Sequence, residues 1–466
     1  MSNREIIPTL VIAVLSVSSL LAEEPIDWFK NAKLGMFIHW GLYSQPAGEW
    51  KGHPTKGGEH FMLYERIPVK EYAMIAEDFN PTGFDAEKWV RAAKDAGMNY
   101  IVYTTKHHDG FAMYDSECSD YNIVRRTPFA ADPLKALAKA CLKEGIKLGL
   151  YYSLGRDWED PDVPTNWPEK AGRSNTWDYP DEDSKQLPRY IERKVKPQLR
   201  ELLTNYGEIA IIWFDTPELV TKEQSRELRE LIHSLQPGCL VNSRIGNGLG
   251  DYTIIEQRLS DKIMTVSWEA CLTMGKNWGY NKYDTVYKTP DMLIRSMTDI
   301  VSKGGNMLLN VGPDMKGCFP PQSEPVLEAF HRWLSINGEA VYATRAWRTF
   351  GETIVEDETE EANREAFHDA EYDGTPKNIV QDIRYTSRGD IIYAIVRNVM
   401  AEDYTLTAFS PATDKVESVA ILDNGGTPGW TLTETGLQIS NVVRDAQKDA
   451  SIYVLKIKLA ARPQAK

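Results

Sequence analysis

The chain has 466 residues, of which 42% are hydrophobic, so it can bury a sizeable core and is not a largely disordered protein. Its formal net charge at pH 7 is -14. Nucleic-acid binding depends on clustered lysines and arginines that neutralise phosphates, so this charge argues against a nucleic-acid partner. The length predicts about two domains, or one large barrel with an appended domain.

The first 22 residues have the pattern of a secretory signal peptide. Arg4 lies near the start, an apolar stretch runs from Leu10 to Leu21, and the small residue Ala22 precedes two glutamates. Serines interrupt the apolar stretch, which is shorter than the ~20 residues that a membrane-spanning helix needs. We therefore expect a mature chain that begins near Glu23, has no membrane span, and is secreted or periplasmic.

Between residues 23 and 345, strand-like runs alternate with amphipathic helices, as a parallel sheet requires. Four times, a predicted helix stops at a glycine and a buried strand follows. This rhythm predicts an α/β fold, a (β/α)8-like (TIM) barrel. The predicted strands are Leu34–His39, Tyr100–Lys106, Lys147–Tyr152, Glu208–Asp215, Leu240–Arg244 and Asn306–Gly312. The predicted helices cover residues 84–96, 134–144, 196–206, 225–235 and 324–337.

The chain changes character after residue 345. Residues 346–380 contain many Glu, Asp and Thr and predict an acidic connection. Residues 381–466 contain short β runs with turn residues between them, which predicts an antiparallel β-sandwich. These runs are Asp382–Thr386, Asp390–Val396, Val416–Leu422, Leu432–Ile439 and Ala450–Lys456.

The most informative stretch is the apolar run that ends in Asp215. A short β-branched run after a glycine is typical of a parallel strand covered on both faces. Asp215 would then emerge at the carboxyl edge of the sheet, where barrel enzymes have their active sites. The alternative is that Asp215 only caps the next helix. Other polar and aromatic residues also follow predicted strands and would converge there: His39, His107, His108, Tyr152, Trp213 and Arg244.

Neither the histidines nor the cysteines have the spacing of a metal site. His107, His108 and Asp109 are adjacent, but neighbouring strand residues point to opposite faces, and no HxH or HExxH spacing accompanies them. The five cysteines lack CxxC spacing, and their odd number excludes a fully paired disulfide framework. We expect neither a metal nor a cofactor.

A pair of carboxylates is what glycosidic hydrolysis requires, because one group protonates the leaving oxygen and another attacks the sugar or activates water. Asp215 therefore needs a partner. Glu49, Glu256 and Glu269 compete for this role, each in a loop-like segment beyond a predicted strand. Spacing alone does not choose among them. The 13 Trp and 22 Tyr also suit sugar recognition, since aromatic rings stack on the apolar faces of pyranoses.

Several motifs carry a family resemblance. The segment from Phe37 to Trp50 resembles the opening signature of the α-L-fucosidases, glycoside hydrolase family 29. Further segments resemble motifs of that family in the same order: Lys106–Phe111, Tyr151–Ser153, Trp213–Asp215, Trp268–Glu269 followed by Asn277–Asn281, and Gly304–Pro313. Together they cover roughly residues 26 to 345.

The resemblance implies a barrel with a C-terminal β-sandwich and a retaining exo-α-L-fucosidase that acts on fucosylated oligosaccharides or polysaccharides. It places Asp215 at the position of the nucleophile. Glu256 is our choice for the acid/base, because it stands in a segment that resembles the family pattern Asp-Tyr-x-x-x-Glu-Gln, with Glu269 as the alternative. The residues that the resemblance implies for fucose binding are His39, Glu49, Trp50, His107, His108, Tyr152, Trp213, Arg244 and Trp278.

Two other functions remain open at this stage. One is an exo-glycosidase for a sugar like fucose, such as α-L-galactose, because pockets discriminate poorly against one added hydroxyl. The other is a catalytically inactive barrel that only binds carbohydrate. Such a protein would keep the aromatic residues without a working carboxylate pair.

Overall fold

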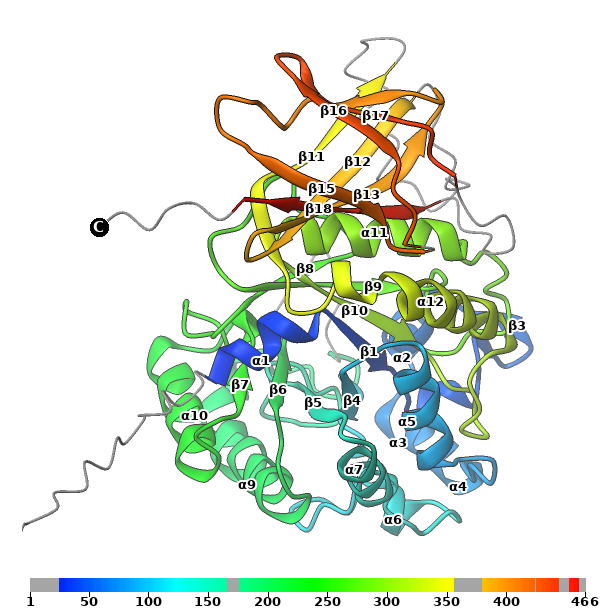
Figure 1. The fold of residues 1–466 in the computed structure, drawn as a ribbon. Coiled ribbons are helices and arrows are strands. Elements are labelled where there is room, and N and C mark those ends of the chain that lie inside the picture. The colour runs from blue at the N-terminus through cyan, green and yellow to red at the C-terminus, as the bar shows by residue number, and fades with distance from the viewer. Residues whose placement is uncertain (1–24, 166–175, 356–378, 424, 444–451, 461–466) are drawn as a thin grey trace, which may run out of the picture.

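The computed structural model describes residues 25–165, 176–355, 379–423, 425–443 and 452–460. The predicted signal peptide and most of the predicted acidic connection lie outside these residues. Within them, a barrel-like α/β domain is followed by an antiparallel β domain (Figure 1). The predicted fold class is confirmed.

Eight parallel strands form one curled sheet in the described part of the α/β domain. Their spatial order is β7-β6-β5-β4-β1-β10-β9-β8, and an isolated parallel bridge between Asn242 and Tyr252 links the two edge strands. The strands are β1 (Leu34–Ile38), β4 (Tyr100–Lys106), β5 (Lys147–Ser153), β6 (Ile211–Asp215), β7 (Leu240–Val241), β8 (Thr253–Glu256), β9 (Trp268–Thr273) and β10 (Asn306–Val311). Strand β7 is shorter than predicted because the chain turns into a 3-10 helix at Ser243–Ile245.

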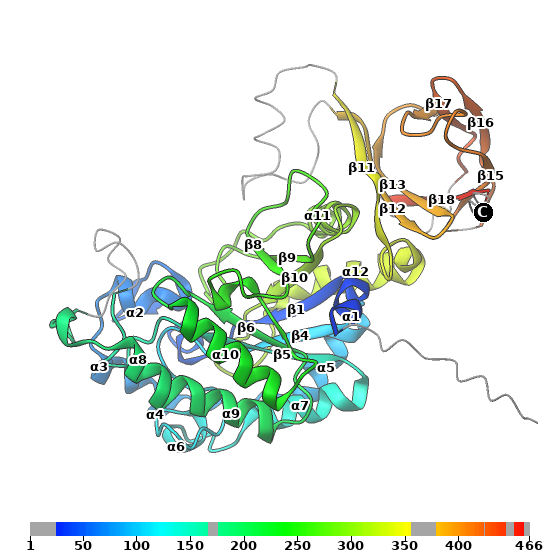
Figure 2. The same ribbon diagram turned by 90° about the vertical axis from the view of Figure 1, so that its left-hand side faces the viewer.

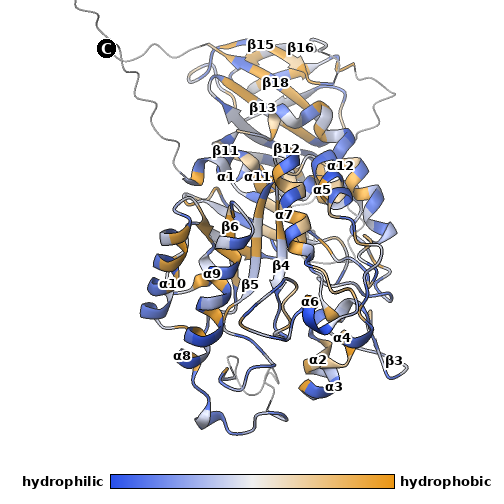
Figure 3. Ribbon diagram, turned by 90° about the horizontal axis from the view of Figure 1, so that it is seen from below, coloured by the Kyte–Doolittle hydropathy of each residue, from blue (hydrophilic) through white to orange (hydrophobic). Residues whose placement is uncertain are grey.

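Helices cover the outer face of this sheet (Figures 1 and 2). Figure 3 shows hydrophobic and hydrophilic residues on the same helices, as α9 and α10 illustrate, so each helix buries one face and exposes the other. The longer helices are α1 (Pro25–Ala32), α5 (Ala86–Asp95), α7 (Pro133–Glu144), α9 (Lys196–Asn205), α10 (Lys222–Leu235), α11 (Pro290–Ser302) and α12 (Glu324–Asn337). The shorter ones are α2 (Phe61–Tyr64), α3 (Val69–Ala73), α4 (Ile75–Asp78), α6 (Ile123–Arg126) and α8 (Leu187–Tyr190). None of the helices described has both the length and the apolarity to cross a bilayer.

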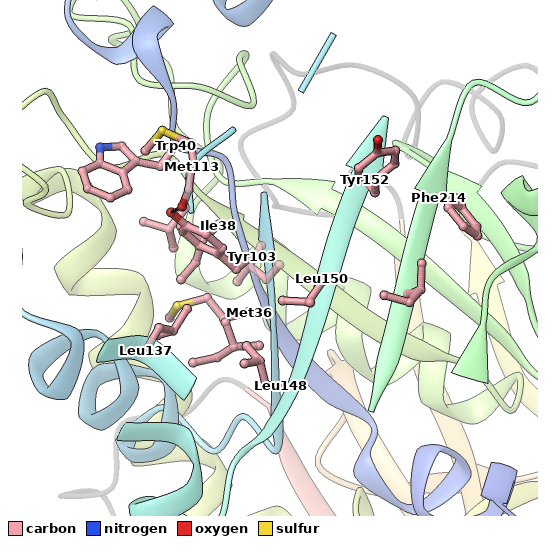
Figure 4. Close-up of a cluster of buried hydrophobic side chains, with 14 of the residues drawn as sticks. Met36, Ile38, Trp40, Tyr103, Met113, Leu137, Leu148, Leu150, Tyr152 and Phe214 are labelled. Atoms are coloured by element: carbon pink, nitrogen blue, oxygen red, sulfur yellow. Dashed lines mark hydrogen bonds between the residues drawn. The ribbon is translucent and has the colours of Figure 1, made fainter. Parts of the chain in front are cut away.

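Side chains of the barrel strands alternate between two buried layers. In β5, Tyr151 belongs to the cluster inside the barrel, with Phe37 and Trp213. Its neighbour Tyr152 belongs to the layer between the sheet and the helices, where Figure 4 shows it with Leu150. Successive strand residues point to opposite faces, so only one residue of each such pair can reach a site at the mouth of the barrel.

The described residues of the β domain form two antiparallel sheets that share one hydrophobic core. The larger has the order β11-β12-β13-β18-β15, and the smaller β14-β17-β16. Their strands are β11 (Arg345–Val355), β12 (Ile379–Arg388), β13 (Ile391–Val399), β14 (Tyr404–Leu406), β15 (Val416–Ile421), β16 (Gly429–Thr433), β17 (Gly436–Ser440) and β18 (Tyr453–Leu459). The predicted C-terminal antiparallel domain is confirmed.

Two details of the β domain differ from the prediction. Residues 346–355 were predicted to belong to the acidic connection, but they form most of β11, which pairs with β12. Most of the acidic residues of this region follow Val355, so the acidic composition belongs to the segment after the strand and not to the strand itself. The predicted run Leu432–Ile439 is divided between β16 and β17, because Gly436 adopts a φ of 137° and the chain turns back there.

A buried network of charges joins the two domains. Asp299 of α11 accepts hydrogen bonds from Arg384 of β12 at 2.7 Å and from Lys303 at 2.5 Å. Arg384 also donates to Asp382 at 2.7 Å, and Arg397 of β13 donates to the same carboxylate at 2.9 Å. All five residues are buried. Removing one partner from such a network leaves an uncompensated buried charge, which is strongly destabilising, so this contact between the domains depends on every member of the network.

We predict that Asp382→Asn makes unfolding less dependent on pH in acid. Burial opposes ionisation of Asp382, but Arg397 and Arg384 outweigh it and hold its pKa at about 2, below the ordinary value of 3.8. The carboxylate therefore stabilises the fold fully above pH ~4, and this contribution is lost as the pH falls toward 2. It amounts to roughly 2 kcal/mol at pH 7.

Denaturant unfolding of the wild type and of Asp382→Asn at pH 7 and at pH values below 4 would measure this contribution. The difference in the free energy of unfolding should be large at pH 7 and shrink in acid. Glu328→Gln, which removes an exposed partner of Arg332, is the matched control and should give no measurable difference at either pH. A constant difference for Asp382→Asn across this range would contradict the prediction.

Candidate active site

A pocket of about 320 Å³ opens at the carboxyl end of the curled sheet. This is where a parallel barrel collects the residues that follow its strands. Eight of the residues predicted from the sequence line it: His39, His107, His108, Trp213, Asp215, Arg244, Glu256 and Trp278. Four others that were considered do not: Glu49, Trp50, Tyr152 and Glu269.

Asp215, the last residue of β6, is held by donors on both carboxylate oxygens. Its Oδ1 accepts hydrogen bonds from Arg244 at 2.7 Å and from the Thr216 amide at 2.9 Å. Its Oδ2 accepts one from the Tyr151 hydroxyl at 2.9 Å. Burial opposes the charge, but Arg244 and Tyr151 outweigh it and lower the pKa of Asp215 below its ordinary value. Asp215 is thus an anion at neutral pH, and Oδ2 is its less occupied oxygen.

Arg244 bridges two carboxylates. One terminal nitrogen of its guanidinium donates to Asp215 and the other donates to Oε2 of Glu256, the last residue of β8. The side chain of Glu256 is 39% exposed and that of Asp215 14%, so Glu256 lies nearer to solvent. The guanidinium also lies 5.1 Å from the centre of the Trp213 ring, and this cation–π contact helps to hold the bridge in place.

The residues that follow the two carboxylates have left-handed backbones. Thr216 has a φ of 57° and Gln257 a φ of 52°. Neither is a glycine, and Thr216 is β-branched, so each conformation costs about 1–3 kcal/mol that the surrounding contacts must offset. The turn at Thr216 directs its amide onto Asp215, and the turn at Gln257 places its amide 3.0 Å from the Cys271 carbonyl. These turns end β6 and β8 with a carboxylate at each tip.

His39 presents a hydrogen-bond acceptor to the pocket. The amide nitrogen of Asn310 donates to the Trp278 carbonyl at 2.7 Å, so its oxygen accepts from Nδ1 of His39, also at 2.7 Å. Burial lowers the pKa of His39 to about 4, and the ring is neutral at pH 7. A neutral ring with a proton on Nδ1 has an unprotonated Nε2, which can accept a hydrogen bond from a hydroxyl group.

His108 is arranged in the same way. The Ser153 hydroxyl donates to the Arg156 carbonyl at 2.8 Å, so it accepts from Nδ1 of His108 at 2.6 Å. Burial lowers the pKa of His108 well below its ordinary value. Its Nε2 is therefore an acceptor, 3.6 Å from Oδ2 of Asp215, and the two do not form an ion pair. A sugar hydroxyl is the kind of donor that these adjacent acceptors can share.

His107 lies beside His108 in the pocket, with the two ring centres 4.2 Å apart. We had expected neighbouring residues to point to opposite faces, but β4 ends at Lys106, so the alternation of a strand no longer applies. Its ring stacks on Tyr151 at 5.4 Å, and its Nδ1 is buried without a hydrogen-bond partner among the residues described. Such an atom gains a partner when a polar ligand enters.

Glu269 lies beneath the pocket rather than in it. The β8–β9 register pairs Glu256 with Cys271, which lines the pocket, whereas Glu269 is two residues deeper on the same face. Tyr100 donates to one of its oxygens at 2.5 Å and the Trp213 indole to the other at 2.9 Å. Burial raises its pKa to about 7. Both glutamates belong to strands, not to the loop-like segments that we had predicted.

Glu49 and Trp50 form strand β2 (Glu49–Trp50), which pairs with β3 (His53–Pro54) outside the pocket. Glu49 accepts a hydrogen bond from Tyr283 at 2.5 Å, and Trp50 packs on Phe61 with ring centres 5.7 Å apart. The hairpin carries both away from the mouth of the barrel. Glu59 is the carboxylate from this region that lines the pocket, and it pairs with His60 at 2.9 Å.

Tyr152 is the tyrosine predicted as a substrate contact, but Tyr151 is the one that lines the pocket. The Tyr152 hydroxyl donates to Gln198 at 2.7 Å in the outer layer of the domain, as its place in Figure 4 illustrates. Two adjacent tyrosines give no sequence signal of which one faces inward. In the structure, Tyr151 pairs with Trp213 of the neighbouring strand. Paired residues share a face, so Tyr151 is the tyrosine that faces inward. Other lining residues that sequence reasoning missed are Phe37, Glu59, His60, Arg156, Thr216, Pro217, Glu218 and Cys271.

No group of three His, Cys, Asp or Glu side chains within the described residues has the geometry to hold a metal ion. All five cysteines have free thiols. The polar groups of the pocket instead provide a paired anion and cation, neutral imidazoles and aromatic rings. This combination of groups suits a polyhydroxylated ring as the ligand.

The profile of the family described as Alpha-L-fucosidase matches residues 15–339. The chain belongs to the α-L-fucosidase family. It is similar to the tissue α-L-fucosidase of Homo sapiens, with 29% identity over 437 residues that cover 89% of this chain and 84% of that protein. The predicted resemblance is confirmed, and the protein is an α-L-fucosidase, a glycoside hydrolase.

Solved fucosidase structures share this fold. Isoenzyme 1 from Paenibacillus thiaminolyticus has 31% sequence identity and a TM-score of 0.78, covering 93% of this chain and 98% of its own. AlfC from Lactobacillus casei in complex with its α-L-fucose product has 42% identity and a TM-score of 0.63, covering 66% of this chain and 98% of its own. The similarity to AlfC therefore extends over about two thirds of this fucosidase.

We predict that the two adjacent tyrosines of the fucosidase have separable effects. Tyr151→Phe removes a hydrogen bond to Asp215 and should lower kcat/KM by at least about tenfold with little change in stability. Tyr152→Phe removes a buried hydrogen bond to Gln198 and should cost about 1 kcal/mol of stability with kcat/KM preserved. Kinetics on an aryl α-L-fucoside and denaturant unfolding of both variants would check this, and the reverse pattern would show that the assigned layers are wrong.

Proposed function

We propose that this fucosidase is a retaining exo-enzyme that releases terminal α-L-fucose through a covalent fucosyl-enzyme intermediate. The observation that carries the proposal is the shared Arg244 bridge between one shielded carboxylate and one exposed carboxylate. Retaining enzymes need two such groups with different tasks, a permanent anion close to the anomeric carbon and a proton donor in contact with the leaving group. Asp215 suits the first task and Glu256 the second.

In the first step, Oδ2 of Asp215 attacks the anomeric carbon of fucose as the glycosidic bond breaks. Oδ1 keeps its bonds from Arg244 and Thr216, which hold the carboxylate in place as its charge is consumed. Glu256 donates its proton to the departing oxygen, so the leaving sugar departs as a neutral alcohol. The products of this step are the fucosyl ester of Asp215 and a carboxylate at Glu256.

In the second step, Glu256 removes a proton from a water molecule, which attacks the same carbon from the face that the leaving group vacated. The bond to Asp215 breaks, fucose departs with its original anomeric configuration, and Glu256 is again protonated. Exposure of Glu256 supports this role because both the leaving sugar and the water must reach it. Glu269 has both oxygens bonded and is enclosed beneath Trp213, which favours a role in holding that indole.

The size and lining of the pocket support an exo-enzyme. A volume of about 320 Å³ lies at the small end of the range for ligand sites, which supports recognition of a single terminal sugar residue. We propose that the substrates are fucosylated oligosaccharides or polysaccharides. The related AlfC enzyme has been solved as a variant with Fuca(1,6)GlcNAc, which supports a fucosylated glycan as the substrate class.

Azide rescue would test the assigned roles. We expect Asp215→Gly to lose at least about 10³-fold in kcat on 4-nitrophenyl α-L-fucoside and to be rescued by azide with formation of β-fucosyl azide. Glu256→Ala should be rescued with formation of the α-azide, because the covalent intermediate still forms on Asp215. Glu269→Gln should give no azide product, because the side chain at position 269 does not face the anomeric carbon.

The stereochemistry of the azide products decides between the outcomes. If the Glu269 variant gave an α-azide and the Glu256 variant gave none, the acid/base role would belong to Glu269 instead of Glu256. Absence of azide products from every variant, with an active wild type that inverts configuration, would overturn the retaining mechanism. A wild type that is inert on both the aryl fucoside and fucosylated oligosaccharides would overturn the proposed function.

We also propose that the fucosidase is exported and loses residues 1–22. Cleavage there leaves α1 intact, and α1 contributes to the base of the barrel through Phe29, whose carbonyl accepts a hydrogen bond from Asn306 at 2.7 Å. Expression of the full chain with a C-terminal tag should yield exported protein with an N-terminus near Glu23. Deletion of residues 2–22 should retain active protein inside the cell. Equal export of both forms would contradict the proposal.

A further inference from the structure

Strand β4 contains an extra residue at the end that approaches the pocket. Up to Thr104, β4 pairs with β5 residue for residue, and Thr104 lies opposite Tyr151. The next residue of β5, Tyr152, lies opposite Lys106, so Thr105 is an additional residue and forms a β-bulge. Bulges are common beside active sites, where they redirect the side chains that follow them.

The bulge shifts the alternation of side chains along β4 by one residue. Tyr100 and Val102 belong to the cluster inside the barrel. Regular alternation would therefore point Lys106 inward and His107 outward. Instead, the Lys106 ammonium lies 4.5 Å from the centre of the Tyr152 ring in the outer layer, and His107 lines the pocket. Without the bulge, a lysine would take the place of a pocket imidazole.

The hydroxyl of Thr105 ties the bulge to the neighbouring strand. It donates a hydrogen bond to the Tyr151 carbonyl at 2.7 Å. The Thr105 carbonyl accepts a hydrogen bond from the Met113 amide at 2.8 Å. Thr105 and Tyr151 are both buried, and a hydrogen bond shielded from water is stronger than an exposed one. The extra residue is therefore fixed both to β5 and to the segment that follows the pocket histidines.

Tyr151 connects this bond to the reactive part of the pocket. Its hydroxyl donates to Oδ2 of Asp215 at 2.9 Å, and its ring stacks on His107 with the ring centres 5.4 Å apart. Both contacts depend on where the Tyr151 backbone lies, and Thr105 is bonded to that backbone. Thr105 itself is not among the described residues that line the pocket. It can therefore influence the reaction only through its neighbours.

We propose that Thr105 is a positioning residue of the fucosidase, whose hydroxyl holds the bulge and thereby orients Tyr151 and His107 in the pocket. The inference rests on the proposed function, because it takes Asp215, the partner of Tyr151, as the nucleophile. The hydroxyl neither contacts the sugar nor takes part in bond breaking. Its removal should therefore slow the reaction by loosening Tyr151 and His107, and the size of the loss should depend on Tyr151.

Thr105→Val, Thr105→Ala and Thr105→Ser separate the hydroxyl from the rest of the side chain. The valine substitution keeps the β-branched shape without the hydroxyl, whereas the other two both lack the methyl group and differ from each other only in the hydroxyl. Thr386→Val is the matched control. Thr386 of β12 is as fully buried as Thr105, and its hydroxyl also donates to a backbone carbonyl, that of Ala340, at 2.7 Å. This control therefore loses an equivalent bond in the β domain, outside the pocket.

The quantity measured is kcat/KM on 4-nitrophenyl α-L-fucoside, at a temperature at which denaturant unfolding shows that each variant is fully folded. We expect Thr105→Val and Thr105→Ala to lower kcat/KM at least about fivefold, because small displacements of positioned groups slow an enzyme strongly. Thr105→Ser should keep kcat/KM within about twofold of the wild type. Thr386→Val should lower the stability about as much as Thr105→Val does, with kcat/KM unchanged.

A double-mutant cycle with Tyr151→Phe tests whether Thr105 acts through Tyr151. The Tyr151→Phe enzyme has already lost the hydrogen bond to Asp215. Adding Thr105→Val to it should therefore cost at least about twofold less in kcat/KM than the same substitution costs in the wild type. Adding Thr386→Val should change kcat/KM in neither background.

Three results would overturn the inference. The first is a kcat/KM for Thr105→Val equal to that of Thr386→Val. The second is an equal loss for Thr105→Ser and Thr105→Ala, because the hydroxyl would then not be responsible, and this comparison does not require that Thr105→Val folds. The third is an effect of Thr105→Val that is the same in the Tyr151→Phe background. All three leave the proposed function intact, since the wild type is active and the azide products of Asp215→Gly test the nucleophile separately. A wild type that hydrolyses no fucoside would instead overturn the proposed function together with the inference.

Discussion

The organisation of the pocket depends on a single guanidinium. Arg244 bonds to Asp215 and to Glu256 at once, and it rests on the face of Trp213. Two carboxylates that face one cavity would repel each other, so a shared cation allows both to remain close. The same bridge keeps Asp215 ionised despite its burial. Trp213 in turn is fixed by Glu269, so the support of the site extends one layer below its floor.

Neutral histidines complement this charged bridge. Burial keeps both imidazoles neutral. Nδ1 of each ring bonds to a partner outside the pocket, Asn310 for His39 and Ser153 for His108, and Nε2 is left as an acceptor. A sugar offers hydroxyl donors, which pair better with unprotonated nitrogens than with imidazolium groups. The interior therefore offers hydrogen-bond acceptors beside the charged Arg244 bridge.

The β domain contributes to the catalytic domain through α11. Asp299 on this helix bonds to Arg384 of the β domain, and Arg384 shares Asp382 with Arg397. Helix α11 leads directly toward β10, which supplies Asn310, the partner of His39. Buried charges tolerate little displacement, because each loses its compensation when it moves. The second domain thus constrains an element that leads to Asn310, the partner of His39.

The sequence by itself determined the alternation of strands and helices, the Asp215 strand end and the family motifs, because periodicity and glycine stops are local properties. It predicted Tyr152 where Tyr151 lines the pocket, because the sequence does not show which face of a strand lies inward. Spacing alone did not choose between Glu256 and Glu269, because it does not show how deep each residue lies. It also assigned Glu49 to the pocket, although a hairpin carries that residue outside. Register between strands distant in sequence fixes depth and face, so only the tertiary structure decided which side chains meet.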